Sequence, residues 1–414
     1  MAPTNDWSTS IVESAMNRTF LLACATNLLI CTGVARADVV LDWNAVMERT
    51  VAGQNPFAQA RFAAITQLAV FEAVNTITRD YEPYLGTIGA PPGASAEAAA
   101  IAAAYRVLKT YLPLVPVVPT LDDARAASLA AIPESQAKAD GIAVGEAVAA
   151  AMIALRNGDG SAPPQFYLPS SSAPGEWQLT AGCPAAGGIL LHWRNVAPFG
   201  IDSSAQFRSE PPPALTSNEY LKDYEEVSLV GGAGSVLRPD DRADVARFYA
   251  AVLAVATWNP AVRQVAQVAG TSLSENARAL ALLNVAISDA LVSVMETKYQ
   301  YTFWRPETAI PGFVPFIATP CFPGYPSAHA SASYAAEEIA RRIFGAGGHS
   351  IVLTSPPAVG VTLTYNSFKE IARDIDDARV YGGIHFRFDQ EAGAVQGRDI
   401  GTYVYKTMLR PVQH

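Results

Sequence analysis

Ala-rich, helix-favouring segments dominate the chain, and they are separated by polar and turn-forming residues. Alanine and leucine favour helix because they lose little conformational freedom there. Alternating apolar and polar positions, the pattern typical of strands, are scarce. The sequence therefore predicts an all-α fold with helices over residues 56–76, 95–112, 121–131, 139–156, 217–229, 240–257, 274–299, 327–344, 365–381 and 390–409.

The connections between these segments are rich in Pro and Gly, and the longest covers residues 158–213. Such a long loop inside a compact domain is often functional. Trp177, His192, Trp193 and Phe199 in this loop could therefore line the mouth of a pocket. They could equally be anchors that hold the loop, and the pattern leaves both interpretations open.

Length and composition allow a substantial core, because half of the 414 residues are apolar. Charged residues make up 16%, the formal net charge is -9, and there is no extended run of Lys or Arg. A nucleic-acid-binding protein would need a basic patch to neutralise phosphates. We therefore expect no nucleic-acid partner.

The N-terminus has the features of an export signal. Residues 16–18 give a short basic start, residues 20–34 are mostly apolar, and residues 35–37 form a small-x-small cleavage site. The apolar stretch is shorter than the roughly 20 residues that span a bilayer, which argues against a membrane anchor. We expect a leader and signal peptide over residues 1–37, cleavage after Ala37, and a secreted or periplasmic protein whose mature chain has no membrane span.

Removal of the signal would leave two of the four cysteines, Cys183 and Cys321. In an oxidising compartment they could pair, although the sequence cannot place them within bonding distance. Metal binding by two cysteines so far apart, without a Cys-x-x-Cys pattern, is less expected. The disulfide therefore stays an open alternative.

Candidate chemistry begins with Lys298 and Arg305, which lie seven residues apart just before Pro306. If the predicted helix continues, seven residues are nearly two turns, so both cations project from one face. Two adjacent cations favour the binding of an anion. A solvated basic edge is the alternative, but the aromatic residues flanking Arg305 argue for burial, where unpaired cations are costly.

A second segment reads Pro326-Ser327-Ala328-His329 and precedes an Ala-rich run. Ser327 is a predicted helix N-cap, so a hydroxyl, free backbone N–H groups and the helix dipole would converge near His329. Anions bind well at such helix starts. The alternative is simple capping beside an exposed histidine.

A third segment runs from Arg379 through Gly382-Gly383 to His385 and Asp389. The two glycines would end the preceding helix and let the chain turn tightly, so that a loop presents His385. Asp389 could cap the last helix, orient His385, or do both. A carboxylate on one imidazole nitrogen fixes the tautomer and makes the other nitrogen a better ligand or nucleophile.

The three motifs, Lys-x6-Arg-Pro, Pro-Ser-x-His and Arg-x5-His-x3-Asp, occur in that order over residues 298–389. Together they resemble the signature shared by vanadium-dependent haloperoxidases and the phosphatidic acid phosphatase type 2 superfamily. The aromatic residues around the first two motifs are similar to those of the soluble haloperoxidase branch. The resemblance implies a helical bundle of the haloperoxidase and acid phosphatase type with long irregular loops. It would form one domain, residues 38–414, with an N-terminal helical region (38–215) and an active-site helical region (216–414).

The resemblance also implies a pocket for vanadate as cofactor. Lys298, Arg305 and Arg379 would neutralise the vanadate oxygens. Ser327 and the backbone N–H of Ala328 would donate hydrogen bonds to them. The family usually has glycine at position 328, and the methyl group of alanine would narrow the pocket or shift the neighbouring histidine.

Catalytic roles follow from the same resemblance. His385 would bind the metal directly beside Asp389, and His329 would act as the acid-base group toward peroxide. Phe322 would lie near the halide. Some haloperoxidases have an upstream acid that partners the acid-base histidine, but the region around residues 248–249 offers no equivalent.

The main hypothesis is a vanadate-dependent haloperoxidase-like enzyme that oxidises halide with hydrogen peroxide. The alternative is an acid phosphatase-type phosphomonoesterase, in which His385 attacks phosphorus in the same pocket and His329 protonates the leaving oxygen. A third hypothesis is a secreted binding protein whose site has decayed, although the retained cations and histidines argue against it. The sequence does not sharply separate the first two.

Overall fold

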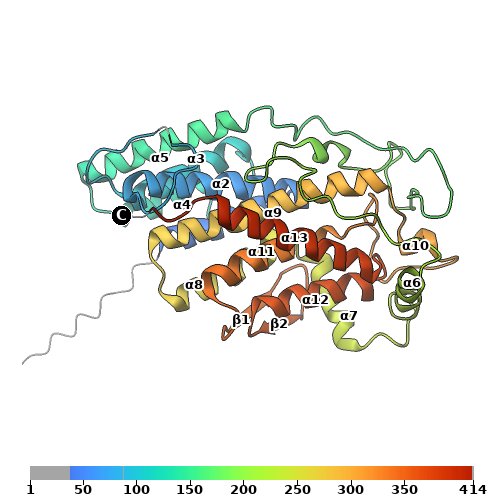
Figure 1. Ribbon diagram of the computed structural model, residues 1–414. Helices are drawn as coiled ribbons and strands as arrows, with labels where there is room; N and C mark the ends of the chain where they lie inside the picture. Colours follow the sequence, from blue (N-terminus) through green and yellow to red (C-terminus); the bar gives the residue numbers. More distant parts are fainter. Residues whose placement is uncertain (1–37, 87, 413–414) are drawn as a thin grey trace, which may run out of the picture. The chain divides into compact units, whose positions relative to one another are not determined.

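The computed structural model describes residues 38–86 and 88–412. Within them, helices form nearly all of the regular structure, which confirms the predicted all-α fold class (Figure 1). Two short antiparallel strands, β1 (Ile351–Thr354) and β2 (Thr362–Tyr365), form a hairpin that the sequence analysis missed. The predicted signal peptide and its cleavage site after Ala37 lie outside the described residues.

The helices are numbered in chain order, and Figure 1 labels most of them. A single 3-10 helix, η1, interrupts the α-helices of the described part. The bounds are α1 (Val39–Val51), α2 (Pro56–Thr78), α3 (Ala96–Tyr111), α4 (Leu121–Ala130), α5 (Gln136–Leu155), η1 (Leu191–Asn195), α6 (Asn218–Val230), α7 (Asp240–Ala251), α8 (Ala254–Ala269), α9 (Leu273–Tyr301), α10 (Pro306–Ala309), α11 (Ala328–Phe344), α12 (Phe368–Tyr381) and α13 (Arg387–Thr407).

Local capping explains why most helices begin where they do. Many start after a Ser, Thr, Asn or Asp in extended conformation, whose side-chain oxygen accepts a hydrogen bond from a first-turn N–H. At α9, Ser272 and Glu275 form a full capping box. α1, capped by Asp38, was not predicted, because its valines favour helix only weakly and its stability comes from packing.

The predicted helix over residues 240–257 is wrong, because the structure has two helices there, α7 and α8, bent by 103°. Val252 and Leu253 between them have extended backbones, which end the first helix. α8 then continues past Pro260, which costs it one backbone donor. The bend matters for the site, because Leu253 lines the cavity described below.

α9 is the central helix of the described residues. It packs against α2, which contacts α3 and α5 in turn, and it also packs against α11 and α13 (Figure 1). Nearly every residue from Ser274 to Tyr299 is buried. The last turn of α9, where Lys298 lies, is therefore inside the core.

By length and composition alone, α9 is apolar enough to cross a membrane. Among the described residues, α7 and α8 would be a second candidate only if the bent pair counted as one span. The apolar window of α9 is completely buried by protein. A helix that is apolar on all sides is what the centre of a helical core requires.

The long loop over residues 158–213 is held to α9 by buried groups. Trp177 and Phe199 are nearly inaccessible to solvent. The carboxylate of Asp289 on α9 accepts hydrogen bonds from the N–H groups of three successive loop residues, the first of them Phe199, at 2.7, 2.7 and 3.0 Å. His192 and Trp193 are also buried, and both line a cavity. The loop aromatics are therefore anchors, and two of them also line a cavity.

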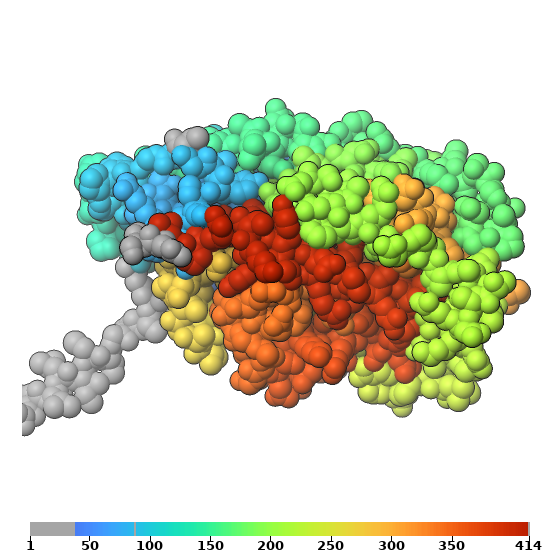
Figure 2. Space-filling view, viewed as in Figure 1, coloured from blue at the N-terminus to red at the C-terminus, as the bar shows by residue number. Residues whose placement is uncertain are grey.

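The same loop lies against α13 and is tied to the segment before α11. Figure 2 shows loop atoms, in green, beside the red atoms of α13 on the visible face. Tyr403 of α13 donates to Asp202 at 3.0 Å, and its ring packs on Phe207. Cys183 of the loop forms a disulfide with Cys321, so the open question of their pairing is answered by the structure.

Candidate active site

Lys298 lies in the last turn of α9 and is fully buried. Its Nζ donates to the carbonyl oxygens of Pro323 and Gly324 at 2.7 and 2.6 Å. Burial, together with the nearby guanidinium of Arg305, holds the pKa of Lys298 well below its usual range. The charged ammonium is thus costly to keep here unless an anion joins it.

Arg305 also lies near Lys298 in the core, but it is not positioned by a continuous helix as the sequence analysis considered. α9 ends at Tyr301, and Thr302 takes a left-handed conformation with φ 45°, so Arg305 does not share a helix face with Lys298. It lies in an extended conformation directly before α10. The side chain is fully buried, which excludes the alternative of a solvated basic edge.

The guanidinium of Arg305 is held by backbone oxygens from two segments. Nε donates to Phe322 O at 3.1 Å, and Nη1 donates to Ile384 O at 2.9 Å. Nη1 also lies 2.9 Å from Nε2 of His385. Within the described chain, Nη2 has no hydrogen-bond partner. Burial lowers the pKa of Arg305 to about 10.

His385 is oriented by Asp389 in the first turn of α13. Nδ1 of His385 lies 2.8 Å from Asp389 Oδ2, and the same oxygen accepts from the Phe386 N–H at 3.2 Å. Asp389 therefore both caps the helix and orients the histidine. Because the guanidinium of Arg305 can only donate, Nε2 of His385 is the acceptor and Nδ1 carries the proton. Burial and the nearby cations hold the pKa of His385 well below its usual range.

The turn that presents His385 requires glycine. Gly382 follows the last residue of α12, and Gly383 has φ 78°, in the left-handed region. A Cβ at Gly383 would come within 2.1 Å of the backbone oxygen of Gly231. The prediction that this glycine pair ends the helix and turns the chain is confirmed.

Ser327 caps α11 as predicted, with Oγ accepting from the Ala330 N–H at 3.3 Å. The N–H group of Ala328 has no carbonyl in a preceding turn and remains available at the helix start. His329 is partly exposed, but its Nε2 is buried and has no hydrogen-bond partner among the described residues. Burial and the nearby cations hold the pKa of His329 well below its usual range, so the imidazole is neutral.

Arg379 enters the site from the last turn of α12. Its Nη1 donates to the backbone oxygen of Tyr249 on α7 at 2.8 Å. Nε has no partner in the part of the chain that the structure describes. Burial and the neighbouring Arg305 lower the pKa of Arg379 to about 9.

The three cations of this cluster exceed the negative charge nearby, which comes mainly from Asp389. The hydrogen bonds that hold Lys298, Arg305 and Arg379 go to backbone oxygens rather than to carboxylates. Buried cations without an ion-pair partner are costly. Over residues 38–86 and 88–412, the unpartnered buried atoms include Arg305 Nη2, Arg379 Nε and His329 Nε2. The site is therefore suited to an anion with several acceptor oxygens.

A cavity of about 430 Å³ lies next to these groups. His329, Arg379 and His385 line it, and so does Phe322, whose ring centroid is 5.3 Å from Lys298 Nζ. Ala328 belongs to the same wall. Much of the remaining wall is apolar, formed by Pro56, Phe57, Leu190, Leu253, Leu291 and Ile317.

Two kinds of residue at the site were missed by the sequence analysis. Asn55, Pro56 and Phe57 begin α2 and line the cavity, but their pattern signals only the start of a helix. Tyr249 contributes a backbone oxygen, and any residue type could do so. These contributions depend on the packing of distant segments and leave no local motif.

The donors around the cavity differ from those of a site for a bare metal cation. In the described residues, no group of three or more His, Cys, Asp or Glu side chains could hold such an ion. One acceptor nitrogen, Nε2 of His385, instead lies among cationic donors and a helix N-terminus. This set fits a metal oxyanion that is held mainly through its oxygens.

Comparisons with known proteins find one matching family model and several similar solved structures. A family model described as the VCPO second helical-bundle domain matches residues 311–414. The crystal structure of a bacterial vanadium-dependent iodoperoxidase is 27% identical to this chain, with a TM-score of 0.75 over 91% of this chain and 97% of its own. Among curated proteins, no significant match is found.

Two further structures support the fold alone. The apo form of a bacterial vanadium-dependent chloroperoxidase is 16% identical, with a TM-score of 0.70 over 86% of this chain and 95% of its own. The holo form of a bacterial vanadium-dependent chloroperoxidase is 15% identical, with a TM-score of 0.67 over 86% and 93%. The family model covers the second and third motifs, and the iodoperoxidase likeness spans nearly all of both chains. The chain is thus similar over most of its length to a vanadium-dependent iodoperoxidase, and its C-terminal quarter matches the VCPO second helical-bundle domain.

Proposed function

We propose that this protein is a vanadate-dependent haloperoxidase that oxidises halide with hydrogen peroxide. The observation that carries the proposal is the convergence of buried, unpaired cationic donors with the acceptor nitrogen of His385 at one cavity. The similar structures bear the names of vanadium-dependent iodoperoxidase and chloroperoxidase. The acid phosphatase alternative is not favoured, because the likeness that spans the chain is to haloperoxidases.

Vanadate fits the donors that surround the cavity. Lys298, Arg305 and Arg379 would neutralise its oxygens, and the unpartnered Nη2 and Nε of the two arginines offer directed N–H bonds. The hydroxyl of Ser327 and the backbone N–H of Ala328 add neutral donors at the start of α11. An oxyanion there would remove the cost of burying three cations together.

His385 would bind the vanadium atom through Nε2. The hydrogen bond from Nδ1 to Asp389 fixes the tautomer and the ring orientation, so the lone pair of Nε2 faces the cationic donors. When bound, vanadate supplies Lewis-acid activation of peroxide toward attack by halide. The part of His385 is then to hold this group in one orientation.

His329 is the proposed acid-base group. It is neutral, and its Nε2 is free of partners within the described residues. It would accept a proton from hydrogen peroxide at Nε2 and later return that proton to the leaving oxygen. The overall reaction combines hydrogen peroxide, halide and one proton to give hypohalous acid and water.

Phe322 marks the proposed halide position. Its ring centroid lies 5.2 Å from Cζ of Arg305 and 5.3 Å from Nζ of Lys298, and the ring lines the cavity. The cations attract a halide ion to this end of the cavity. The apolar wall around it excludes bulk water, which strengthens that attraction.

We also propose that the protein is exported. The disulfide between Cys183 and Cys321 is typical of proteins from oxidising compartments. It agrees with the export signal expected over residues 1–37. Mass spectrometry of the protein recovered from the periplasm or the medium should find Asp38 as its first residue, and an intact N-terminus would contradict the proposal.

Halogenation of a phenol dye by purified protein tests the proposed activity. With vanadate, hydrogen peroxide and bromide or iodide, the dye should be halogenated, and omission of vanadate should abolish the reaction. The same preparation is offered an aryl phosphate without vanadate. Release of phosphate, with no halogenation of the dye, would replace the peroxidase proposal by the phosphatase alternative.

A further inference from the structure

The side chain of Arg379 depends on one backbone acceptor in the described structure. Nη1 donates to Tyr249 O at 2.8 Å, whereas Nε has no partner. Tyr249 lies near the C-terminal end of α7, where carbonyl oxygens lack partners within the helix and can accept other donors. The position of this oxygen therefore decides where the guanidinium of Arg379 lies.

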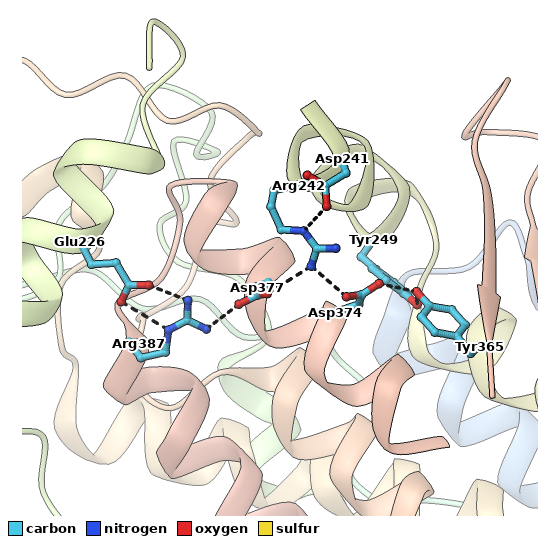
Figure 3. A network of polar contacts seen from close by, with 8 residues as sticks. All are labelled: Glu226, Asp241, Arg242, Tyr249, Tyr365, Asp374, Asp377 and Arg387. Atoms are coloured by element: carbon cyan, nitrogen blue, oxygen red, sulfur yellow. Dashed lines mark hydrogen bonds and ion pairs between the residues drawn. The ribbon is translucent and has the colours of Figure 1, made fainter. Parts of the chain in front are cut away.

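Hydrogen bonds also link the side chain of Tyr249 to α12, the helix that carries Arg379. Its hydroxyl lies 2.8 Å from that of Tyr365 at the end of β2, and Tyr365 donates to Oδ2 of Asp374 on α12 at 2.9 Å (Figure 3). Since the one proton of Tyr365 goes to Asp374, Tyr249 is the donor within the tyrosine pair. We call the chain Tyr249–Tyr365–Asp374 the tyrosine bridge.

The carboxylate at the end of the tyrosine bridge is itself fixed. Asp374 Oδ1 accepts from Arg242 of α7 at 2.9 Å, and the same nitrogen of Arg242 contacts Asp377 at 3.2 Å (Figure 3). Asp377 in turn accepts from Arg387, the first residue of α13, at 3.0 Å. The bridge therefore ends on a network that joins α7, α12 and α13.

We propose that the tyrosine bridge is a positioning device for oxyanion binding, because it fixes the Tyr249 oxygen and, through it, Arg379. α12 carries both Arg379 and Asp374. The Arg379 guanidinium extends from this helix, and its acceptor, the Tyr249 oxygen, is tied to the same helix through Asp374. Tyr249 and Tyr365 are buried, so water cannot readily replace a lost hydroxyl contact. The inference rests on the oxyanion pocket of the proposed function and is independent of the halide chemistry.

The test compares Tyr365→Phe with Tyr334→Phe in the whole protein. Tyr334 is a matched control, because each tyrosine is 5% exposed and donates to a carboxylate on α12, which for Tyr334 is Asp376 at 2.6 Å. Isothermal titration with vanadate, and separately with inorganic phosphate, gives the Kd of each variant. Tyr365→Phe breaks both hydrogen bonds of the bridge, and we expect it to weaken binding about 3- to 10-fold, whereas Tyr334→Phe should change Kd by less than about 2-fold.

A double-mutant cycle that combines Tyr365→Phe with Arg379→Ala shows whether the loss of affinity in Tyr365→Phe acts through Arg379. If the tyrosine bridge acts through Arg379, Tyr365→Phe changes Kd no further in the Arg379→Ala protein. Thermal unfolding of both single tyrosine variants shows whether they lose similar stability, so that fold damage is separated from loss of affinity.

Three outcomes would overturn the inference: wild-type affinity in Tyr365→Phe, equal weakening in Tyr334→Phe, or additive losses in the cycle. A wild-type protein that binds vanadate but oxidises no halide would contradict only the peroxidase proposal and leave this comparison valid. A wild-type protein that binds neither vanadate nor phosphate would overturn both.

Discussion

Nε2 of His385 lies 2.9 Å from Nη1 of Arg305, so the lone pair of the imidazole faces a group that can only donate. Asp389 accepts from the other ring nitrogen at 2.8 Å. In the hydrogen-bonded series Arg305–His385–Asp389, Nε2 of His385 is therefore the acceptor and Nδ1 carries the proton. This series joins the segment before α10 to the start of α13, and this contact brings two motifs that are distant in sequence into one site.

The two histidines should separate binding from turnover. His385→Ala removes the proposed vanadium ligand and should abolish vanadate retention. His329→Ala should leave the vanadate Kd nearly unchanged and lower kcat by about 100-fold or more, because the acid-base group is lost. Isothermal titration and steady-state halide oxidation measure the two effects, and equal loss of vanadate binding in both variants would contradict the assigned roles.

Arg305 should contribute to oxyanion affinity through charged hydrogen bonds. We expect Arg305→Ala to weaken vanadate and phosphate binding roughly 10- to 100-fold, since charged hydrogen bonds are stronger than neutral ones. Arg410→Ala is the control, because Arg410 is an exposed arginine paired with Glu82. If both variants bind the anions alike, the buried cation cluster is not the binding site.

Gly383 should tolerate no side chain. Gly270 at the end of α8 has a similar left-handed φ of 64°, but nothing lies within 4 Å of its hypothetical Cβ. Gly270→Ala should therefore cost about 1–2 kcal/mol of unfolding free energy, and Gly383→Ala about 3 kcal/mol or more, because it adds a clash with the Gly231 oxygen. Denaturant unfolding measures both, and equal costs would argue against a tightly packed turn at His385.

Acid should destabilise the protein through His329, whose Nε2 is buried. The pKa of His329 lies well below 6.5 in the folded protein and near about 6.5 in the unfolded chain. Below that pH the unfolded chain binds a proton that the folded protein does not, so the free energy of unfolding falls as pH drops. We expect His329→Asn to show a shallower fall between about pH 6.5 and 5 in urea unfolding than the wild type does. Equal slopes would show that His329 is not held neutral.

Local signals in the sequence predicted much of the fold and part of the site geometry. The cap at Ser327, the turn at Gly383 and the double role open to Asp389 all follow from rules that act within a few residues. The helix does not continue from Lys298 to Arg305, because α9 ends at Tyr301, so the conditional expectation of a shared helix face does not hold. A period of seven residues describes a helix face only while the helix lasts.

Contacts between distant segments could not be predicted from one sequence. The Tyr249 oxygen that holds Arg379 is a backbone atom, and the start of α2 lines the cavity only because α2 packs on α9. The break between α7 and α8 is likewise set by packing, since no glycine or proline marks residues 252–253. Tertiary contacts override local propensity at these positions.

A crystal structure of the protein soaked with vanadate tests the central claim most directly. The account predicts vanadium bonded to Nε2 of His385, with its oxygens contacting Lys298, Arg305 and Arg379. Vanadate bound elsewhere on the protein, or a cavity that excludes it while these side chains keep their positions, would contradict the account.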